Sequence, residues 1–538
     1  MRLQLISKLK KNGFLKLGLT SLLASVFAFS AAEAKRKTLP KKKSSVSRAS
    51  EANPKLAALR QQLSQALTMA KSGQYQQAAT ALFNLARRSE LESEKAQIKY
   101  ILGLMLMELH LNQVAAFQFV EVIRLENPKY TKLAIEKLST VADGLGDDTL
   151  LNYAISRIDV NNIPTSGRDM IHFRIGEIKL KNKKLEEAIQ NFSKVQLGSS
   201  YYNQALFNRG LAELELNRID NSIKSFQQLL NLRSKIGITD TNRVAAQIAI
   251  ARALYQKQDW DAAIEAYSQI PRDHFLWHQA LFEQTWAMLR SARFRSSLSN
   301  LQSLHSTYYE DFYIPESLLL RSIVYLYICK YDEMEKVLTL FEKSYSPVKT
   351  KINSFLNNNT DPISFYNEIE KAQTIKKGEE LKTPARLPYM VLKNISDEGD
   401  VRRSLGYMRR LTEEKQMIEG QSGLKSSSIG QYALKVIGTR LKNTKLTIGD
   451  IVKAHLQNMQ SELKDLFEQA SFTRYEMING KKESLKKRIV GKNLPTPIDE
   501  KIDRDFYVEN GFEYYPFQGE YWLDEIGNYH YLGQQNCE

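Results

Sequence analysis

The chain has few of the residues that interrupt helices or carry most enzyme chemistry. Its 538 residues include only 13 Pro and 25 Gly, which favours a mainly helical protein. It has seven His and two Cys, and the motifs HExxH, CxxC, GxSxG, GxGxxG and GxxxxGK[S/T] are all absent. The sequence therefore predicts no cofactor and no catalytic site, and we expect a protein that is not an enzyme.

A metal site is not predicted either. His274 and His278 are four positions apart and would share a helix face, as two zinc ligands can. No carboxylate or Cys pattern accompanies them, so we expect a packed or surface pair. An active site within residues 372–538 remains the alternative, should polar groups converge there.

The positive charge is concentrated at one end. The formal net charge is +16, but residues 1–50 hold 12 Lys or Arg against one Glu, which leaves +5 for the other 488 residues. The body of the chain is therefore close to balanced, and we expect no nucleic-acid partner.

The first 34 residues resemble a Sec-type signal peptide. A basic start is followed by the apolar run Leu17–Phe29, which is too short to span a bilayer comfortably, and by the cleavage pattern Ala32–Ala34. Cleavage before Lys35 would leave no transmembrane span and place the protein in the periplasm, at the outer membrane or cell wall. The alternative is an uncleaved anchor.

Residues 35–54 then predict a disordered basic linker. Its segment Lys35–Arg48 would contact anionic wall polymer or lipid headgroups, or serve only as a solvated spacer.

Two copies of one pattern follow each other between residues 171 and 232. In each, a small residue comes 12 positions after a glycine, and an aromatic residue comes four positions later. Two closely packed antiparallel helices need small residues where they cross and a bulky one beside them. The glycine, small residue and aromatic are Gly176, Ala188 and Phe192 in one copy, and Gly210, Ser222 and Phe226 in the other.

The position of the small residue recurs at intervals of 34 to 41 along the chain, although Leu151 marks a degenerate copy and Ser297 and Met334 are looser substitutes. This pattern resembles the tetratricopeptide (TPR) repeat, a helix-turn-helix unit of 34 residues. The resemblance covers residues 55–345 and implies an all-α, right-handed superhelical solenoid of about eight repeats. The marker positions are Ala78, Ala115, Leu151, Ala188, Ser222, Ala263, Ser297 and Met334.

The TPR resemblance also implies a concave groove, lined by the first helix of each repeat, that binds peptides or helices of other envelope proteins. The alternative is that the aromatic side chains at the groove positions only pack between repeats. The positions carried over are Phe173, Glu177, Phe207, Leu211, Ile248, Arg252, Tyr255, Phe282, Trp286, Leu319, Ile323 and Tyr327.

A finer resemblance lies in a few patches. They are similar to exported TPR proteins of myxobacteria and relatives, some of them linked to adventurous gliding motility. The patches are Leu281–Ala287, Phe294, Asn300–Leu304, Pro315–Ser317, Cys329–Glu333 and Gly519–Glu525.

After the repeats we predict a linker or cap at 346–387 and a basic helical module at 388–492. Residues 372–492 carry a net charge of +10, and their apolar residues form a heptad-like seam from Leu441 to Ala470. The seam would form a helical hairpin, a coiled coil with a second copy or a docking helix. Because Gly438 and Gly449 would interrupt a single rod, we expect two helices.

The C-terminal segment 493–538 has a net charge of −8, opposite in sign to that of residues 372–492, and holds ten aromatic residues. We expect an ordered, irregular segment with a small hairpin, lying either on the basic module or on a partner. Cys329 falls in the turn of the last repeat, and in an exported protein it could pair with Cys537. The alternative is two unrelated thiols.

These features predict a non-enzymatic interaction scaffold in the cell envelope, and the finer resemblance implies that it belongs to a gliding-type apparatus. The runner-up is a cell-wall or polysaccharide-associated factor that recruits an envelope enzyme.

Overall fold

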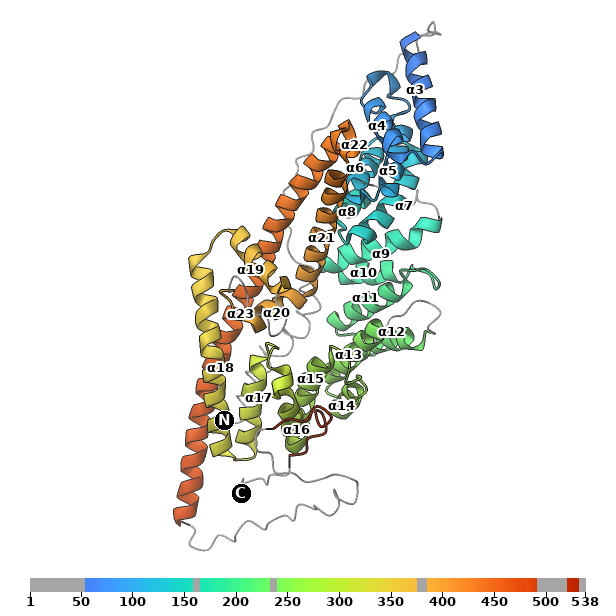
Figure 1. Ribbon diagram of the computed structural model, residues 1–538. Coiled ribbons are helices and arrows are strands. Elements are labelled where there is room, and N and C mark those ends of the chain that lie inside the picture. Colours follow the sequence, from blue (N-terminus) through green and yellow to red (C-terminus); the bar gives the residue numbers. More distant parts are fainter. Residues whose placement is uncertain (1–53, 158–164, 233–239, 375–384, 491–519, 532–538) are drawn as a thin grey trace, which may run out of the picture. The chain divides into compact units, whose positions relative to one another are not determined.

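The computed structural model describes residues 54–157, 165–232, 240–374, 385–490 and 520–531 (Figure 1). Within these ranges the chain consists of helices joined by turns and loops, and no strand occurs. The all-α fold class predicted from the sequence is confirmed. The predicted signal peptide and residues 35–53 of the basic linker lie outside the described residues.

The chain divides into two compact units. Unit 1 comprises residues 1–201 and 398–451, and unit 2 comprises residues 202–397 and 452–538. The predicted basic module 388–492 therefore does not form one body, because its residues are divided between the two units.

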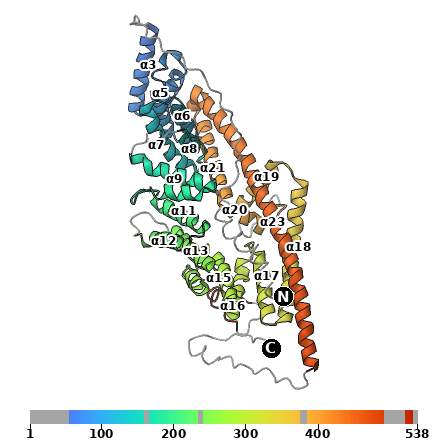
Figure 2. The same ribbon diagram turned by 180° about the vertical axis from the view of Figure 1, so that it is seen from behind.

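The repeat helices of unit 1 form successive pairs, coloured blue to cyan in Figure 1, and α21 lies beside α6 and α8 in both views (Figures 1 and 2). The helices of unit 1 are α3 (Pro54–Lys71), α4 (Tyr75–Leu85), α5 (Lys95–Glu108), α6 (Asn112–Arg124), α7 (Pro128–Leu145), α8 (Thr149–Ile155), α9 (Thr165–Lys181), α10 (Leu185–Phe192), α21 (Gly399–Gly420), α22 (Ser422–Ser426) and the start of α23 (Ser428–Val490), with the short η2 (Ser89–Leu91).

Unit 2 continues the helix pairs and ends in longer helices. Its elements are α11 (Tyr202–Glu215), α12 (Ile219–Asn231), α13 (Asp240–Lys257), α14 (Trp260–Ser268), α15 (Trp277–Arg290), α16 (Phe294–Leu304), η5 (Thr307–Tyr309), α17 (Pro315–Tyr327), α18 (Tyr331–Asn358), α19 (Pro362–Thr374), α20 (Tyr389–Asp397) and the rest of α23.

One turn geometry joins the two helices of every repeat. Each of the eight marker residues follows, by five positions, a residue with a positive φ, and all eight are fully buried. At Lys183, for example, φ is 59°, and the next N–H, of Lys184, donates to the carbonyl of Lys179 over 2.9 Å. This left-handed residue and its six-to-one hydrogen bond end the first helix and reverse the chain. The repeat spacing in the sequence therefore reflects a recurring backbone turn.

The glycine of the sequence pattern is needed because an aromatic ring lies against it. A Cβ atom added to Gly210 would lie 2.7 Å from Cε1 of Phe226, and one added to Gly176 would lie 2.5 Å from Cε1 of Phe192. The hydroxyl of Ser222 donates to the carbonyl of Gly210 over 2.8 Å. First and second helices thus approach each other closely where the first has no side chain.

We expect Gly210→Ala to lower the free energy of unfolding by about 1–3 kcal/mol, because the Phe226 ring must move to make room. The matched control is Gly144→Ala in α7, where an added Cβ meets nothing within 4 Å. There, better helix propensity should stabilise by up to about 1 kcal/mol. Urea unfolding of both variants measures the difference, and equal midpoints would contradict the close-approach interpretation.

In unit 1, α21 supplies side chains that satisfy the ends of repeat helices. The Glu414 carboxylate accepts a hydrogen bond from the N–H of Gln113 over 2.9 Å, at the start of α6. The Tyr407 hydroxyl donates to Oε1 of Gln113 over 2.6 Å. Arg410 donates to the carbonyl of Leu145, at the end of α7, over 2.8 Å. Because helix ends leave backbone groups without partners, these contacts tie α21 to the repeats.

The region after the repeats differs from its predictions in two places. Residues 346–358, expected to begin a linker or cap, are no linker: they continue α18 through Pro347, since Val348, Ile352 and Phe355 remain buried. The stretch expected to form two helices is the single helix α23, 63 residues long. A glycine costs a helix only about 1 kcal/mol, and burial of the seam outweighs it.

The seam of α23 packs inside the molecule. In unit 2, α23 runs along α18 in both views (Figures 1 and 2), with Phe467 against Phe341 at 4.8 Å between ring centroids. Gln460 donates to Asn353 over 2.7 Å, and Arg474 pairs with Glu342. Of the three alternatives predicted for the seam, this part of α23 matches the docking helix, and the surface on which it docks is α18.

Residues 520–531 lie on the last repeats of unit 2 rather than on α23. Backbone N–H groups of Gly527 and Tyr531 donate to the hydroxyls of Ser303 and Ser299 on α16, both over 2.9 Å. Ile526 is buried, and Arg272 donates to Asn528 over 2.7 Å. This part of the tail is irregular, as predicted, and contains no strand.

Cys329 lies in the turn between α17 and α18, with a φ of 57°, and is not a free thiol. Cys537 lies outside the described residues, so its pairing with Cys329 stays a prediction.

Candidate interaction surface

The twelve predicted groove positions all lie on first helices, but their exposure differs. Five are buried and belong to the core, with little area left for a ligand: Phe173, Ile248, Trp286, Leu319 and Ile323. Arg252 is nearly buried, with a side chain that is 11% exposed. The other six are half-buried and remain the candidate contacts: Glu177, Phe207, Leu211, Tyr255, Phe282 and Tyr327.

Several of the half-buried rings also pack against a neighbouring second helix. Phe207 on α11 lies 5.4 Å from Phe226 on α12 between ring centroids, within one repeat, and Tyr327 on α17 stacks at the same distance on Phe294 of α16, in the preceding repeat. Each ring thus joins a first helix to a second helix while part of its surface stays open. The packing alternative therefore describes the buried part of each ring, and a role of the open part in a groove stays a prediction.

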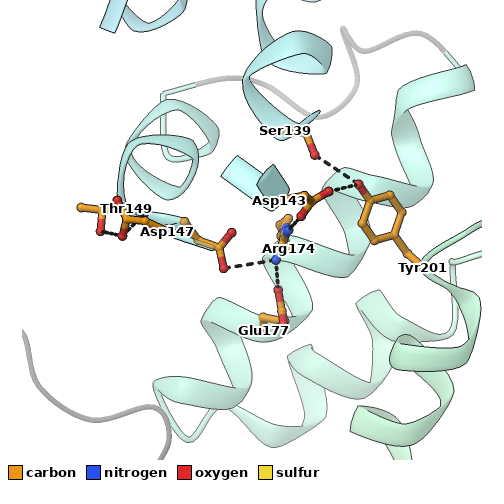
Figure 3. A network of polar contacts seen from close by, with 8 residues as sticks. Ser139, Asp143, Asp147, Thr149, Arg174, Glu177 and Tyr201 are labelled. Atoms are coloured by element: carbon orange, nitrogen blue, oxygen red, sulfur yellow. Dashed lines mark hydrogen bonds and ion pairs between the residues drawn. The ribbon is translucent and has the colours of Figure 1, made fainter. Parts of the chain in front are cut away.

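A cluster of charges, here called the Arg174 cluster, lies in unit 1 on the first helices α7 and α9 and in the turn before α8 (Figure 3). The Arg174 guanidinium pairs with Asp143, with Asp148 at 3.3 Å and with Glu177 at 2.9 Å. Its side chain is only 7% exposed, while the three carboxylate side chains are 28–45% exposed. The guanidinium therefore lies beneath a half-exposed acidic surface.

Tyr201 completes the Arg174 cluster from the loop before α11. Its hydroxyl donates to Asp143 over 3.0 Å, and the Ser139 hydroxyl lies 3.2 Å away (Figure 3). Its ring stacks on Phe173 at 5.3 Å. These contacts hold the Asp143 carboxylate in place beside Arg174.

The Arg174 cluster is acidic overall. Three carboxylates surround Arg174, and Arg403 is a second cation whose charge acts on both Asp148 and Glu177. Burial raises the pKa of Asp148 and of Glu177, and the positive charge of Arg174 opposes that rise. Carboxylates in this state favour an additional cationic partner.

Sequence reasoning found two members of this cluster, Phe173 and Glu177, and missed the others. Arg174 and Glu177 are three positions apart on α9, a spacing that allows a pair on one helix face. Asp143 and Asp148 precede Arg174 by 31 and 26 residues and reach it only through packing of α7 and α8 against α9. No local sequence pattern indicated that these two carboxylates would pair with Arg174.

In unit 2, Arg252 is held by its neighbours. Its guanidinium donates two hydrogen bonds to Glu283 on α15, over 2.8 and 2.6 Å, and Tyr267 donates to the same carboxylate over 2.9 Å. Both charged side chains are almost entirely buried. This groove candidate therefore has a structural role that joins α13 to α15.

His274 and His278, which have the spacing of two zinc ligands, are packed against other groups of the protein. The ring of His278 lies 4.1 Å from that of Phe312, and burial lowers the pKa of His278 to about 4. Nδ1 of His274 accepts from the N–H of Leu276 over 3.2 Å. Among the described residues, no group of three or more His, Cys, Asp or Glu is arranged to hold a metal ion.

The repeated turn, the buried small residues and the ring against glycine agree with the comparison of the sequence with known families. Residues 207–274 match the tetratricopeptide repeat. The matched TPR segment runs from α11 to beyond the end of α14. TPR domains bind protein partners, so the fold suggests a protein–protein interaction scaffold.

Solved structures similar to this chain include TPR proteins. PilF of Pseudomonas aeruginosa is 14% identical over 41% of this chain and 97% of its own, with a TM-score of 0.28. RapI without ligand is 11% identical over 72% and 99%, with a TM-score of 0.30. A TPR protein of Parabacteroides merdae is 12% identical over 54% and 93%, with a TM-score of 0.23. No curated protein matches the sequence.

None of the helices in the described part of the chain combines the length and the apolar character needed to cross a membrane.

Proposed function

We propose that this protein is an exported, non-enzymatic scaffold of the cell envelope that binds segments of partner proteins on the first helices of its TPR repeats. One observation carries the proposal. The first helices present half-exposed carboxylates in the Arg174 cluster and half-buried rings such as Phe207 and Phe282. TPR repeat proteins are in general non-catalytic scaffolds, which supports the same conclusion.

The chemistry of these faces favours partner segments with basic or apolar side chains. On the Arg174 cluster of unit 1, a Lys or Arg side chain would pair with the half-exposed carboxylates of Asp143 and Glu177. On the rings of unit 2, apolar side chains would cover the exposed ring surface. A partner that carries both kinds of segment would gain specificity from charge and affinity from the buried apolar area.

The envelope location rests on the sequence of residues 1–34, and the role in a gliding-type apparatus rests on the patches around Leu281–Ala287 and Gly519–Glu525. A second candidate function is a cell-wall or polysaccharide-associated factor. The basic segment Lys35–Arg48 favours it, since Lys and Arg side chains would attract anionic polymer.

A photo-crosslinking residue placed at Phe207 or Phe282 in cells tests the scaffold. We expect both positions to give a covalent adduct with a defined partner protein in the envelope fraction. Gln227 on α12 and Glu265 on α14, exposed residues of second helices, serve as controls and should give none. Equal adducts at all four positions, or none at Phe207 and Phe282, would contradict the proposal.

The carboxylates of the Arg174 cluster give a second measurement in the same cells. The double variant Asp143→Asn and Glu177→Gln should recover several-fold less of that partner, because the acidic surface is lost while Arg174 stays solvated by the amides. Glu186→Gln, which removes an exposed carboxylate on α10, should leave the recovery unchanged.

A further inference from the structure

The segment 520–531 is held against α16 by two hydrogen bonds of matching spacing (Figure 1). The N–H groups of Gly527 and Tyr531 donate to the hydroxyls of Ser303 and Ser299, both over 2.9 Å. The two donors are four residues apart in the segment, and the two acceptors are four residues apart on the helix, which is about one turn. The helix therefore presents acceptors at the spacing that the backbone of the segment requires.

The polar groups on α16 are oriented by the repeats themselves. The Ser299 hydroxyl donates to the carbonyl of Arg295 over 3.0 Å, and the Ser303 hydroxyl donates to the carbonyl of Ser299 over 3.4 Å. Because each hydroxyl proton is directed to the helix backbone, the oxygen lone pairs remain available to N–H groups of the segment. Gln302 is held by Arg321 on α17, which donates to its Oε1 over 2.9 Å.

Three further contacts involve side chains of the segment. The Gln302 amide donates to the Tyr521 hydroxyl over 3.3 Å. Arg272, in the loop before α15, donates to Oδ1 of Asn528 over 2.7 Å. Ile526 is 7% exposed, so its side chain is covered. The surface thus distinguishes particular side chains at fixed positions, in addition to holding the backbone.

Gly527 allows the backbone of the segment to lie close to α15. A Cβ atom added at this position would lie 3.0 Å from both Cη2 and Cζ2 of Trp277, the first residue of that helix. The φ of Gly527 is +91°, a conformation that other residues rarely adopt. The surface is therefore selective for glycine between Ile526 and Asn528.

Little apolar burial holds the segment in place. Of residues 520–531, only Ile526 is buried, whereas Trp522 and Leu523 are 64% and 69% exposed. A segment held by polar contacts and one buried side chain can leave its surface while the helices beneath it stay folded. The same surface would then be open to another peptide.

We propose that this surface, here called the α16 site, is a peptide-binding site that residues 521–531 occupy as an internal ligand. Its external ligand is a segment of a partner protein that has Tyr, Ile-Gly-Asn and Tyr at the spacing of Tyr521, Ile526–Asn528 and Tyr531. The site lies on a second helix and is separate from the first-helix surfaces proposed above. The residues of the α16 site are Arg272, Trp277, Ser299, Gln302 and Ser303.

The existence of a partner rests on the proposed scaffold function, whereas recognition of the peptide is tested without a partner. The probe is a fluorescein-labelled synthetic peptide of residues 519–533, and fluorescence anisotropy follows its binding to the full-length protein. The substitutions Ile526→Asp and Gly527→Val, made together in the protein and not in the probe, give the released variant. We expect this variant to bind the probe at least about tenfold more tightly than the unchanged protein does, because a tethered ligand competes at high effective concentration.

The matched control in the segment is Leu523→Ser, which changes a side chain that is 69% exposed. The protein with this substitution should bind the probe as weakly as the unchanged protein does. A probe that carries Gly527→Val should not bind the released variant, since its side chain would collide with Trp277.

The serines of α16 provide a second test. Ser299→Ala together with Ser303→Ala, added to the released variant, should weaken binding of the unchanged probe at least about fivefold, since two hydrogen-bond acceptors are lost. Alanine is favoured within helices, so α16 should stay intact. Ser296→Ala, at an exposed position of the same helix, is the control and should leave the affinity unchanged.

Hydrogen exchange shows whether the segment has left the α16 site. The amides of Gly527 and Tyr531 should be protected in the unchanged protein and should exchange at least about tenfold faster in the released variant. Protection that persists in the released variant, equal affinity of the probe for the two proteins, or no binding to the released variant would overturn the site. Each of these results would leave the scaffold proposal to the crosslinks at Phe207 and Phe282.

Discussion

Replacing Arg252 with methionine is expected to lower the free energy of unfolding by about 3–5 kcal/mol, because Glu283 would remain buried without its counter-charge. The two side chains are 11% and 5% exposed, and the guanidinium holds the carboxylate through two hydrogen bonds. Tyr267 and Gln279 would still donate to Glu283, but neither carries a positive charge. Chemical unfolding followed by circular dichroism measures the loss.

The matched control for Arg252 is Arg293, which pairs with Asp261 over 2.8 Å but in solvent, with side chains 49% and 73% exposed. Arg293→Met should cost no more than about 1 kcal/mol. The double variant Arg252→Met with Glu283→Met should recover most of the loss, since it leaves no buried charge. If the single and double variants were equally destabilised, lost packing rather than an uncompensated charge would be the cause.

Replacing Glu414 with glutamine should stabilise the protein above neutral pH and have little effect at pH 5. Burial raises the pKa of Glu414 to about 8, although backbone N–H groups of Gln113 and Asn112 favour its ionised form. The folded protein therefore holds a proton that the unfolded chain, with an ordinary Glu pKa, releases. The contribution of Glu414 to the free energy of unfolding therefore falls as the pH rises from about 4.5 to about 8, and it stays constant above that range.

The glutamine side chain keeps a hydrogen-bond acceptor for Gln113 and has no proton to lose. Its advantage should grow across this pH window to the order of 2–4 kcal/mol. Glu419→Gln, on the same helix but exposed and paired with Lys415, is the control and should show no such trend. The measurement is the urea midpoint of unfolding of the Glu414→Gln variant and of the unchanged protein at pH 5, 7 and 9. A difference between the two midpoints that does not change with pH, or that has the opposite sign, would refute the burial argument.

The two contacts tested by these predictions hold helices together within each unit. Arg252 joins α13 to α15 across adjacent repeats, and Glu414 joins α21 to the start of α6. Both contacts satisfy polar groups inside the protein, where an unmet charge or N–H is costly. They leave the half-exposed carboxylates and rings of the first helices available to a partner.

The candidate interaction surface was predictable in part. The repeat spacing placed all twelve groove positions on first helices, because helix position follows from the register of the turn. It did not separate buried Phe173 and Trp286 from half-buried Phe207 and Phe282, since exposure depends on how much of each helix its neighbours cover. Charge partners such as Asp143 were missed for the same reason.

The sequence by itself determined the repeat register. The left-handed turn, the buried small residue and the ring against glycine all act within one repeat, at separations of at most 16 residues, so they leave a local pattern. Only the tertiary structure decided that α23 is one helix, that residues 520–531 lie on α16, and that Glu414 meets Gln113 from 301 positions away. Such contacts depend on surfaces that exist only after the helices pack, and no periodicity in the chain records them.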